Sequence, residues 1–152
     1  MRKPGPKRKG TSKQPAKKPL SAGENSLECI YEQLKAILAK HAPPLKLCEM
    51  QLGKKSGVQL VVPKPVAVAG AYGGKPVNLQ MAAAILQKDY VGFYLMCIYA
   101  SADVKRKLSP ALLKLLKGKS CFHVKALDEG LRKDIEEALV LSEQGYQANG
   151  WL

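Results

Sequence analysis

The chain has 152 residues and a formal net charge of +13, and 46% of its residues are apolar. This length suits one domain, and the apolar fraction is sufficient for a buried core. The first 20 residues contain no apolar stretch typical of secretory signals, and no uncharged run reaches the ~18 residues of a transmembrane helix. The four cysteines form no CxxC pair. These features predict a cytoplasmic protein with reduced thiols and no membrane span.

Basic residues are concentrated at the N-terminus. Residues 1–20 contain eight cations and no acid, whereas the rest of the chain contains 17 basic and 12 acidic residues. Residues 1–23 are rich in Lys, Pro, Gly and Ser and have little to bury, so we predict a disordered tail. The boundary is predicted near Gly23, with residues 24–152 forming one domain. The cations of the tail are Arg2, Lys3, Lys7, Arg8, Lys9, Lys13, Lys17 and Lys18.

The first predicted element of the domain is a helix over residues 24–41. Apolar residues recur there with helical spacing from Leu27 to His41, which indicates one buried stripe. Pro43 and Pro44 follow directly and should end the helix, because proline cannot continue the backbone hydrogen bonding.

A series of short strands is predicted next. The runs are rich in β-branched residues or alternate with period two, and Gly-containing turns separate them. Residues 90–100 are apolar on both alternating faces, which is typical of a central strand. The predicted strands are 45–52, 58–62, 66–72, 77–86 and 90–100, and the predicted turns are 54–57 and 73–74.

The last third of the domain returns to helices. Ser109 followed by Pro110 predicts an N-cap and first turn, and this short helix should end at Gly118. Residues 118–120 resemble the end of a phosphate-binding loop, but Leu113 stands where that loop needs glycine, so we expect a helix C-cap and strand entry instead. A last strand is predicted at 121–125. Asp128 should cap a final helix, whose buried stripe comprises Leu131, Ile135, Ala138 and Leu139. Trp151 is expected to fold back onto the core.

The order of these elements indicates the fold class. Helices flank a run of strands, and no helix separates the early strands, so parallel β-α-β winding is disfavoured. We therefore predict an α+β domain in which the N- and C-terminal helices pack on one face of an antiparallel sheet.

Part of the chain resembles the bacterial YdhG-like domains. The resemblance lies in residues 88–125 and near the C-terminus, in the segments VGFYLM and LSPALLKLLKGKSCFHVK and in Tyr146 to Trp151. It implies a compact α+β domain similar to frataxin. Because a member of that family is regarded as a frataxin-like iron chaperone, it also implies weakly bound iron and an iron-acceptor protein as partner.

Four carboxylates are the candidate metal ligands. Glu24, Glu28 and Glu32 are spaced by four residues and fall on one face of the first predicted helix, and Glu49 lies on the first predicted strand. Carboxylate oxygens suit ferrous iron, so this stripe could hold the metal weakly. The alternative is a solvated helix face whose acids stabilise the helix dipole. Cys121 and His123 share a sheet face, but two ligands make only half of a zinc site, and His41 is the sole other histidine.

A second hypothesis is nonspecific association with nucleic acid or an acidic surface. The eight cations of the tail would attract a polyanion, and the absence of aromatic residues there predicts little base preference. If they share a face, six further cations would add a patch on the domain: Lys105, Arg106, Lys107, Lys114, Lys117 and Lys119. An enzyme is the least favoured class, since no motif for an activated nucleophile is present.

Overall fold

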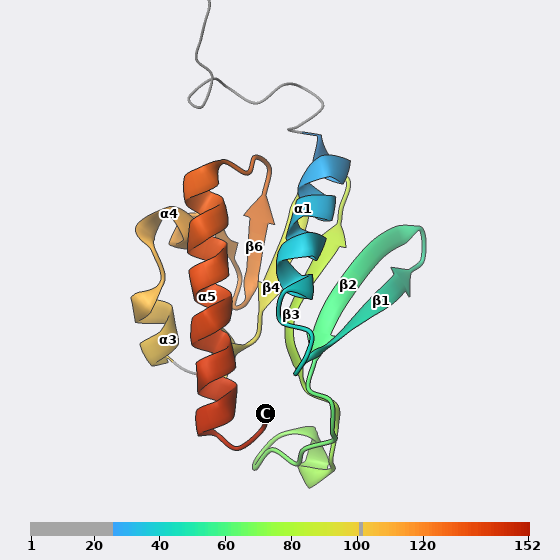
Figure 1. Ribbon diagram of the computed structural model, residues 1–152, viewed down its shortest axis with the longest axis vertical. Helices are drawn as coiled ribbons and strands as arrows, with labels where there is room; N and C mark the ends of the chain where they lie inside the picture. Colours follow the sequence, from blue (N-terminus) through green and yellow to red (C-terminus); the bar gives the residue numbers. More distant parts are fainter. Residues whose placement is uncertain (1–25, 101) are drawn as a thin grey trace, which may run out of the picture.

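The computed structural model describes residues 26–100 and 102–152 (Figure 1). The predicted tail at 1–23 with its eight cations, the predicted boundary and Glu24 lie outside these residues. In the part of the chain that is described, six strands form one antiparallel sheet in the order β1-β2-β3-β4-β6-β5. The strands are β1 (Lys46–Leu52), β2 (Lys55–Val61), β3 (Gln80–Leu86), β4 (Val91–Leu95), β5 (Leu116–Lys117) and β6 (Cys121–Val124).

Two long helices lie on one face of this sheet (Figure 1). The N-terminal helix α1 packs against β2, β3 and β4, and the C-terminal helix α5 contacts β3 and the short helices beside it. The prediction of an α+β fold with an antiparallel sheet is therefore confirmed. The helices are α1 (Leu27–Ala39), α2 (Cys97–Ala100), α3 (Ala102–Lys107), α4 (Pro110–Leu113) and α5 (Glu129–Ala148).

Alternation along the strands places the core between the sheet and the helices. Ala82 and Ala84 of β3 point to this side, and α1 packs mainly against their strand. Phe93 of β4 lies opposite Phe122 of β6, with ring centroids 5.8 Å apart, and both rings are fully buried. The small residues of β3 thus lie under α1, while the two phenylalanines fill the neighbouring strands.

Helix α1 begins three residues later than the periodicity predicted. Its N-cap is Ser26, whose side chain accepts a hydrogen bond from the backbone N–H of Cys29 at 3.1 Å. This capping satisfies one of the free amides of the first turn, so it fixes the start of the helix at Leu27. The predicted apolar stripe is confirmed over its central members, which are buried: Ile30, Tyr31, Leu34, Ile37 and Leu38. Its two ends, Leu27 and His41, are only partly buried.

The hairpin between β1 and β2 has a tighter turn than predicted. Leu52 lies opposite Lys55, so only Gly53 and Lys54 form the turn, and Gly53 has a φ of 67° that favours glycine. Residues 55–57, expected as a turn, belong to β2.

The expected strand at 66–72 is also wrong. Val66 makes one isolated bridge to Val77, and residues 72–74 form a 3-10 turn. Pro63 and Pro65 stand on either side of Lys64 and donate no backbone hydrogen bond, so the ladder of β2 does not extend through this segment.

Residues 90–100 change from strand to helix, so the prediction of one central strand over this segment is wrong. Strand β4 ends at Leu95, and α2 begins at Cys97. Cys97 is buried against α5, where its Sγ lies 2.8 Å from the Oγ of Ser142. The apolar pattern is therefore explained by burial in two different elements, and a short apolar run does not distinguish a strand from a helix.

The segment after Ser109 is shorter in helix and longer in strand than expected. The predicted N-cap is confirmed, because Ser109 accepts from the backbone N–H of Leu112 at 3.1 Å. Helix α4 nevertheless ends at Leu113, and β5 pairs with β6 from Leu116 onward. Residues 118–120 form the turn of this hairpin, with Gly118 at a φ of 84°, so the predicted helix C-cap is wrong.

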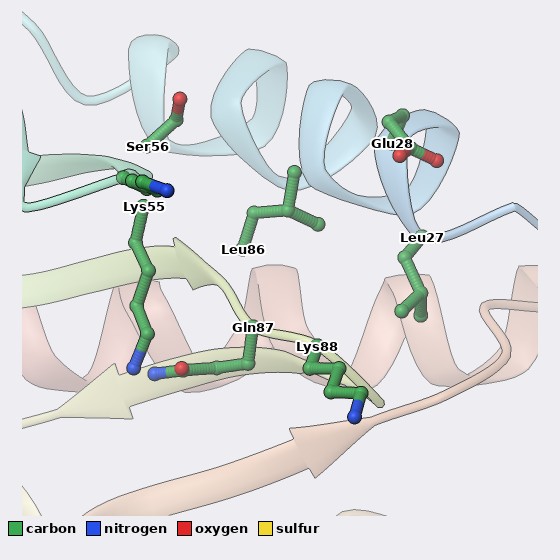
Figure 2. Close-up of a pocket in the computed structure, with 8 residues that line it drawn as sticks. Leu27, Glu28, Lys55, Ser56, Leu86, Gln87 and Lys88 are labelled. Atoms are coloured by element: carbon green, nitrogen blue, oxygen red, sulfur yellow. The ribbon is translucent and has the colours of Figure 1, made fainter.

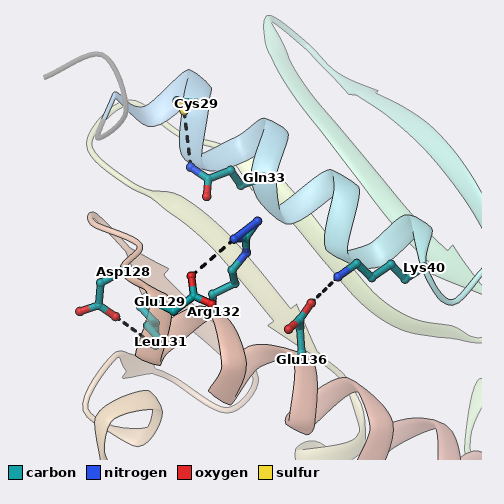
Figure 3. Close-up of polar contacts among 8 residues, drawn as sticks. All are labelled: Cys29, Gln33, Lys40, Asp128, Glu129, Leu131, Arg132 and Glu136. Atoms are coloured by element: carbon teal, nitrogen blue, oxygen red, sulfur yellow. Dashed lines mark hydrogen bonds and ion pairs between the residues drawn. The ribbon is translucent and has the colours of Figure 1, made fainter. Parts of the chain in front are cut away.

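Helix α5 agrees with the sequence prediction and is joined to α1 by polar contacts (Figure 3). Asp128 caps it by accepting from the backbone N–H of Leu131 at 2.8 Å. Lys40 Nζ lies 2.6 Å from Glu136 Oε2, which links the end of α1 to the middle of α5. Trp151 folds back as expected and meets Tyr146 edge-to-face, with ring centroids 5.1 Å apart.

We predict that Asp128→Ala lowers the free energy of unfolding by about 1 kcal/mol, because the first turn of α5 loses its cap. Asp128→Asn is the matched control, since an asparagine oxygen can accept the same hydrogen bond. Urea unfolding followed by circular dichroism measures both variants. Equal losses in the two variants would show that the charge of Asp128, and not its capping bond, stabilises the helix.

Candidate functional site

Positive charge is distributed unevenly over the folded part of the chain. Residues 26–152 contain 17 basic and 11 acidic residues, a net charge of +6. The segment 103–125 contains seven basic residues and one acid, so it carries a net charge of +6 by itself. The remaining residues of this range hold ten cations and ten acids, which cancel. The excess charge therefore lies entirely in the segment that runs from α3 to Lys125, directly after β6.

Three of these cations line one pocket at the sheet edge. Lys114 follows α4, Lys117 lies on β5, and Lys125 follows β6. The backbone N–H of His123 donates to the carbonyl of Leu115 at 2.9 Å and holds the wall of the pocket together. The pocket has a volume of ≈ 370 Å³ and is lined by Lys114, Leu115, Lys117, His123, Lys125 and Ala126.

This pocket, which we call the lysine pocket, answers part of the sequence prediction. Lys114 and Lys117 do share one surface, and Lys125, which was not among the six predicted cations, joins them there. Lys119 lies in the β5–β6 turn, and residues 105–107 belong to α3, so these four cations do not line the pocket. Local spacing alone could not identify Lys125, because the antiparallel pairing of β5 and β6 brings it near Lys114.

An aromatic stack borders the lysine pocket. The rings of Tyr90 and His123 lie 3.7 Å apart between centroids and are inclined by 9°, so they are stacked face to face. Val91 opposes Val124 and Gly92 opposes His123, which makes Tyr90 and Lys125 the next residues along the two strands. No local sequence pattern points to a role for Tyr90, since its contact with His123 arises only from the pairing of β4 with β6.

The stack belongs to the sheet face opposite α1 and α5. Tyr94 lies on this face too, in one cross-strand row with Ala83 and Cys121. Gly92 leaves room for the Tyr94 ring, because a Cβ at Gly92 would lie 3.0 Å from that ring. This sheet face, which we call the open face, therefore presents two tyrosines and a histidine from adjacent strands.

Burial controls the titration of the polar groups in that row. It raises the pKa of Tyr94 to about 12, and the neighbouring Cys121 contributes in the same direction. Burial also raises the pKa of the Cys121 thiol, although the hydrogen bond with Tyr94 partly opposes this. Both groups are protonated at neutral pH, so Cys121 offers no thiolate as a nucleophile or metal ligand there.

The predicted carboxylate stripe is divided in the structure. Glu49 of β1 accepts from Lys35 of α1 at 3.2 Å, and this contact with the added charge of Glu32 raises the pKa of Lys35. The ammonium group of Lys35 thus pairs with one candidate ligand and interacts electrostatically with another. Glu28 instead lines a second pocket of ≈ 440 Å³ together with Lys54, Lys55 and Lys88 (Figure 2).

Metal-ligating side chains do not gather elsewhere in the described residues. Among these residues there is no group of three or more His, Cys, Asp or Glu side chains placed to hold a metal ion. His41 does not complete a site with Cys121 and His123, because its Nδ1 lies 2.6 Å from Glu143 Oε1 on α5. The iron site therefore stays a prediction from the sequence.

No protein-family model, no curated protein and no solved structure matches this chain. The resemblance to YdhG-like domains accordingly stays a prediction as well. None of the helices in residues 26–100 and 102–152 combines the length and apolar character needed to cross a membrane.

We predict that Tyr94 ionises near pH 12, about two units above the ordinary tyrosine value of 10.0. Its raised pKa contributes stability that is present below pH 10 and is lost as the pH rises from 10 through 12, because the unfolded chain releases the proton first. Spectrophotometric titration of phenolate should lose its step near pH 12 in Tyr94→Phe. A missing step near pH 10 in that variant would contradict the assignment.

Proposed function

We propose that the protein binds nucleic acid through the lysine pocket and the cations of residues 1–20. One observation carries the proposal: the whole net charge of residues 26–152 lies in the segment 103–125, and three of its lysines line one pocket. Phosphate groups bound by lysines release counterions, and this release drives association without base contacts. The chemistry suits any nucleic acid backbone, so this part of the binding is nonspecific in sequence.

The other pocket distinguishes this proposal from a general effect of charge. It also contains three lysines, Lys54, Lys55 and Lys88, but Glu28 lies among them. A carboxylate repels phosphate, whereas the lysine pocket contains no acid among its lining residues. The two pockets therefore provide a matched comparison in which the same number of positive charges can be removed.

We predict that replacing Lys114, Lys117 and Lys125 with glutamine reduces the salt dependence of DNA binding. Each lost phosphate contact should reduce the slope of log K against log salt concentration by about 0.9. Deletion of residues 1–20 should reduce the slope further. Fluorescence anisotropy with a labelled duplex at several salt concentrations measures both effects.

The control is the triple glutamine variant at Lys54, Lys55 and Lys88. It removes the same charge from the pocket that contains Glu28 and should change the slope much less. Equal reductions in the two triple variants would mean that net charge, and not the lysine pocket, determines binding.

A second proposal is weak iron binding by a frataxin-like fold. It is supported by the sequence resemblance and by the approach of Glu32 and Glu49 to Lys35 from α1 and β1. Oxygen ligands of this kind suit ferrous iron, but Lys35 competes for the same carboxylates. An iron-acceptor protein would be the partner on this proposal.

We predict that Lys35→Gln strengthens ferrous binding if those carboxylates are ligands, because a competing cation is removed. Lys40→Gln is the control, since Lys40 is the C-cap residue of the same helix but pairs with Glu136. Ferrous titration followed by NMR should shift the signals of Glu32 and Glu49 at lower metal concentration in Lys35→Gln. No response of either signal at millimolar iron would reject the site.

A further inference from the structure

We infer that the nucleic acid bound at the lysine pocket is single-stranded, with one unpaired base stacked on the Tyr90–His123 pair. This inference rests on the proposed function and names the form of nucleic acid that the same site accepts. It is carried by the geometry of the ring stack, by its position beside the lysines, and by the open face to which it belongs.

The ring stack has the geometry of a stacked base. The separation of 3.7 Å between the ring centroids is close to the spacing of about 3.4 Å between neighbouring bases along a strand. The inclination of 9° makes the two rings nearly parallel, as stacked bases are. Tyr90 and His123 are each only half-buried, so part of the pair remains accessible. A base placed on the accessible side would continue a stack that the protein has already begun.

The lysine pocket lies where the phosphates of that nucleotide would be held. His123 belongs both to the stack and to the lining of the pocket, whereas Tyr90 does not line it. The pocket is therefore bounded by the histidine of the stack. Its volume of ≈ 370 Å³ falls within the range of roughly 300–1,000 Å³ that small-ligand sites occupy.

The positive charges of the pocket complement the negative phosphates of a nucleotide. Lys114, Lys117 and Lys125 line the pocket together with His123 of the stack, and no acid lines the pocket with them. Single-stranded nucleic acid is recognised by this combination of a cationic surface and exposed aromatic rings, because every base has a face that can stack.

A duplex cannot use both parts of the site. Its bases are already stacked and paired, so only its phosphates would reach the lysines. A single strand offers the phosphates and an unpaired base together. The structure therefore assigns the aromatic pair to discrimination between single strands and duplexes, and the lysines to binding of both.

Three oligonucleotides of equal length test this inference on the full chain: oligodeoxythymidine, an abasic strand with the same phosphates, and a duplex. Wild-type protein should bind oligodeoxythymidine about 5- to 150-fold more tightly than the abasic strand, which is the range for one stacked base. Equal binding of these two strands would overturn the inference even if every variant failed to fold.

Variants of Tyr90 identify the ring responsible. Tyr90→Ala should lower affinity for oligodeoxythymidine about tenfold and leave affinity for the abasic strand and duplex within twofold. Tyr90→Phe should retain wild-type affinity, because the stacking ring remains. Tyr72→Ala is the control, since Tyr72 is 57% exposed and lies outside the open face. A uniform loss for all three oligonucleotides in Tyr90→Ala would overturn the assignment of a stacking role.

Failure of the proposed function gives a different result. If wild-type protein shows no salt-dependent binding to the duplex or to either strand, the lysine pocket does not bind nucleic acid. The proposed nucleic-acid function and the single-strand inference are then both wrong. If the duplex binds with a salt slope that depends on the pocket lysines while the base makes no difference, only the single-strand inference is rejected.

Discussion

Alternation of side chains along the antiparallel strands determines both the core and the candidate site. Phe93 and Phe122 face the helices and are fully buried, whereas the next residues, Tyr94 and His123, face the opposite side. A shift of one residue in the pairing of β4 with β6 would exchange these sets. The buried phenylalanine pair therefore holds the register that also places the aromatic side chains of the open face.

The helices stabilise this arrangement from the other side of the sheet. Helix α1 packs over the small residues of β3, and its C-terminal end is joined to α5 by two contacts of 2.6 Å, from Lys40 to Glu136 and from His41 to Glu143. The hydrogen bond from Lys40 also lowers the pKa of Glu136. Acids of α5 are thus directed partly toward α1, while the net positive charge of the domain lies in the segment 103–125.

Local sequence signals predicted the long helices well, because their information is contained within one or two turns. The stripe of α1 and the cap of α5 at Asp128 are examples. The same reasoning failed at residues 90–100, where β4 and α2 both bury apolar side chains. A short apolar run indicates that its residues are buried, but it does not distinguish a strand from a helix.

The candidate site could not be predicted from local sequence patterns, because its residues come together only through strand pairing. Tyr90 and His123 are far apart in the chain and stack only because β4 and β6 are neighbours. The carboxylates showed the opposite error: their helical spacing was clear, but the lysines that approach them come from α1 itself and from the β1–β2 hairpin. In both cases the electrostatic environment depends on tertiary contacts.

The strand order has a consequence for self-association. Strand β5 ends one side of the sheet and has only two residues, and the exposed Lys117 occupies one of them. Long, uncharged edge strands invite another chain to add a strand, and a short edge with a lysine discourages this. The same lysine that lines the pocket therefore helps to keep the pocket free of a second protein chain. Lys117 thus has two effects at this edge of the sheet: it discourages self-association and it contributes a positive charge to the pocket.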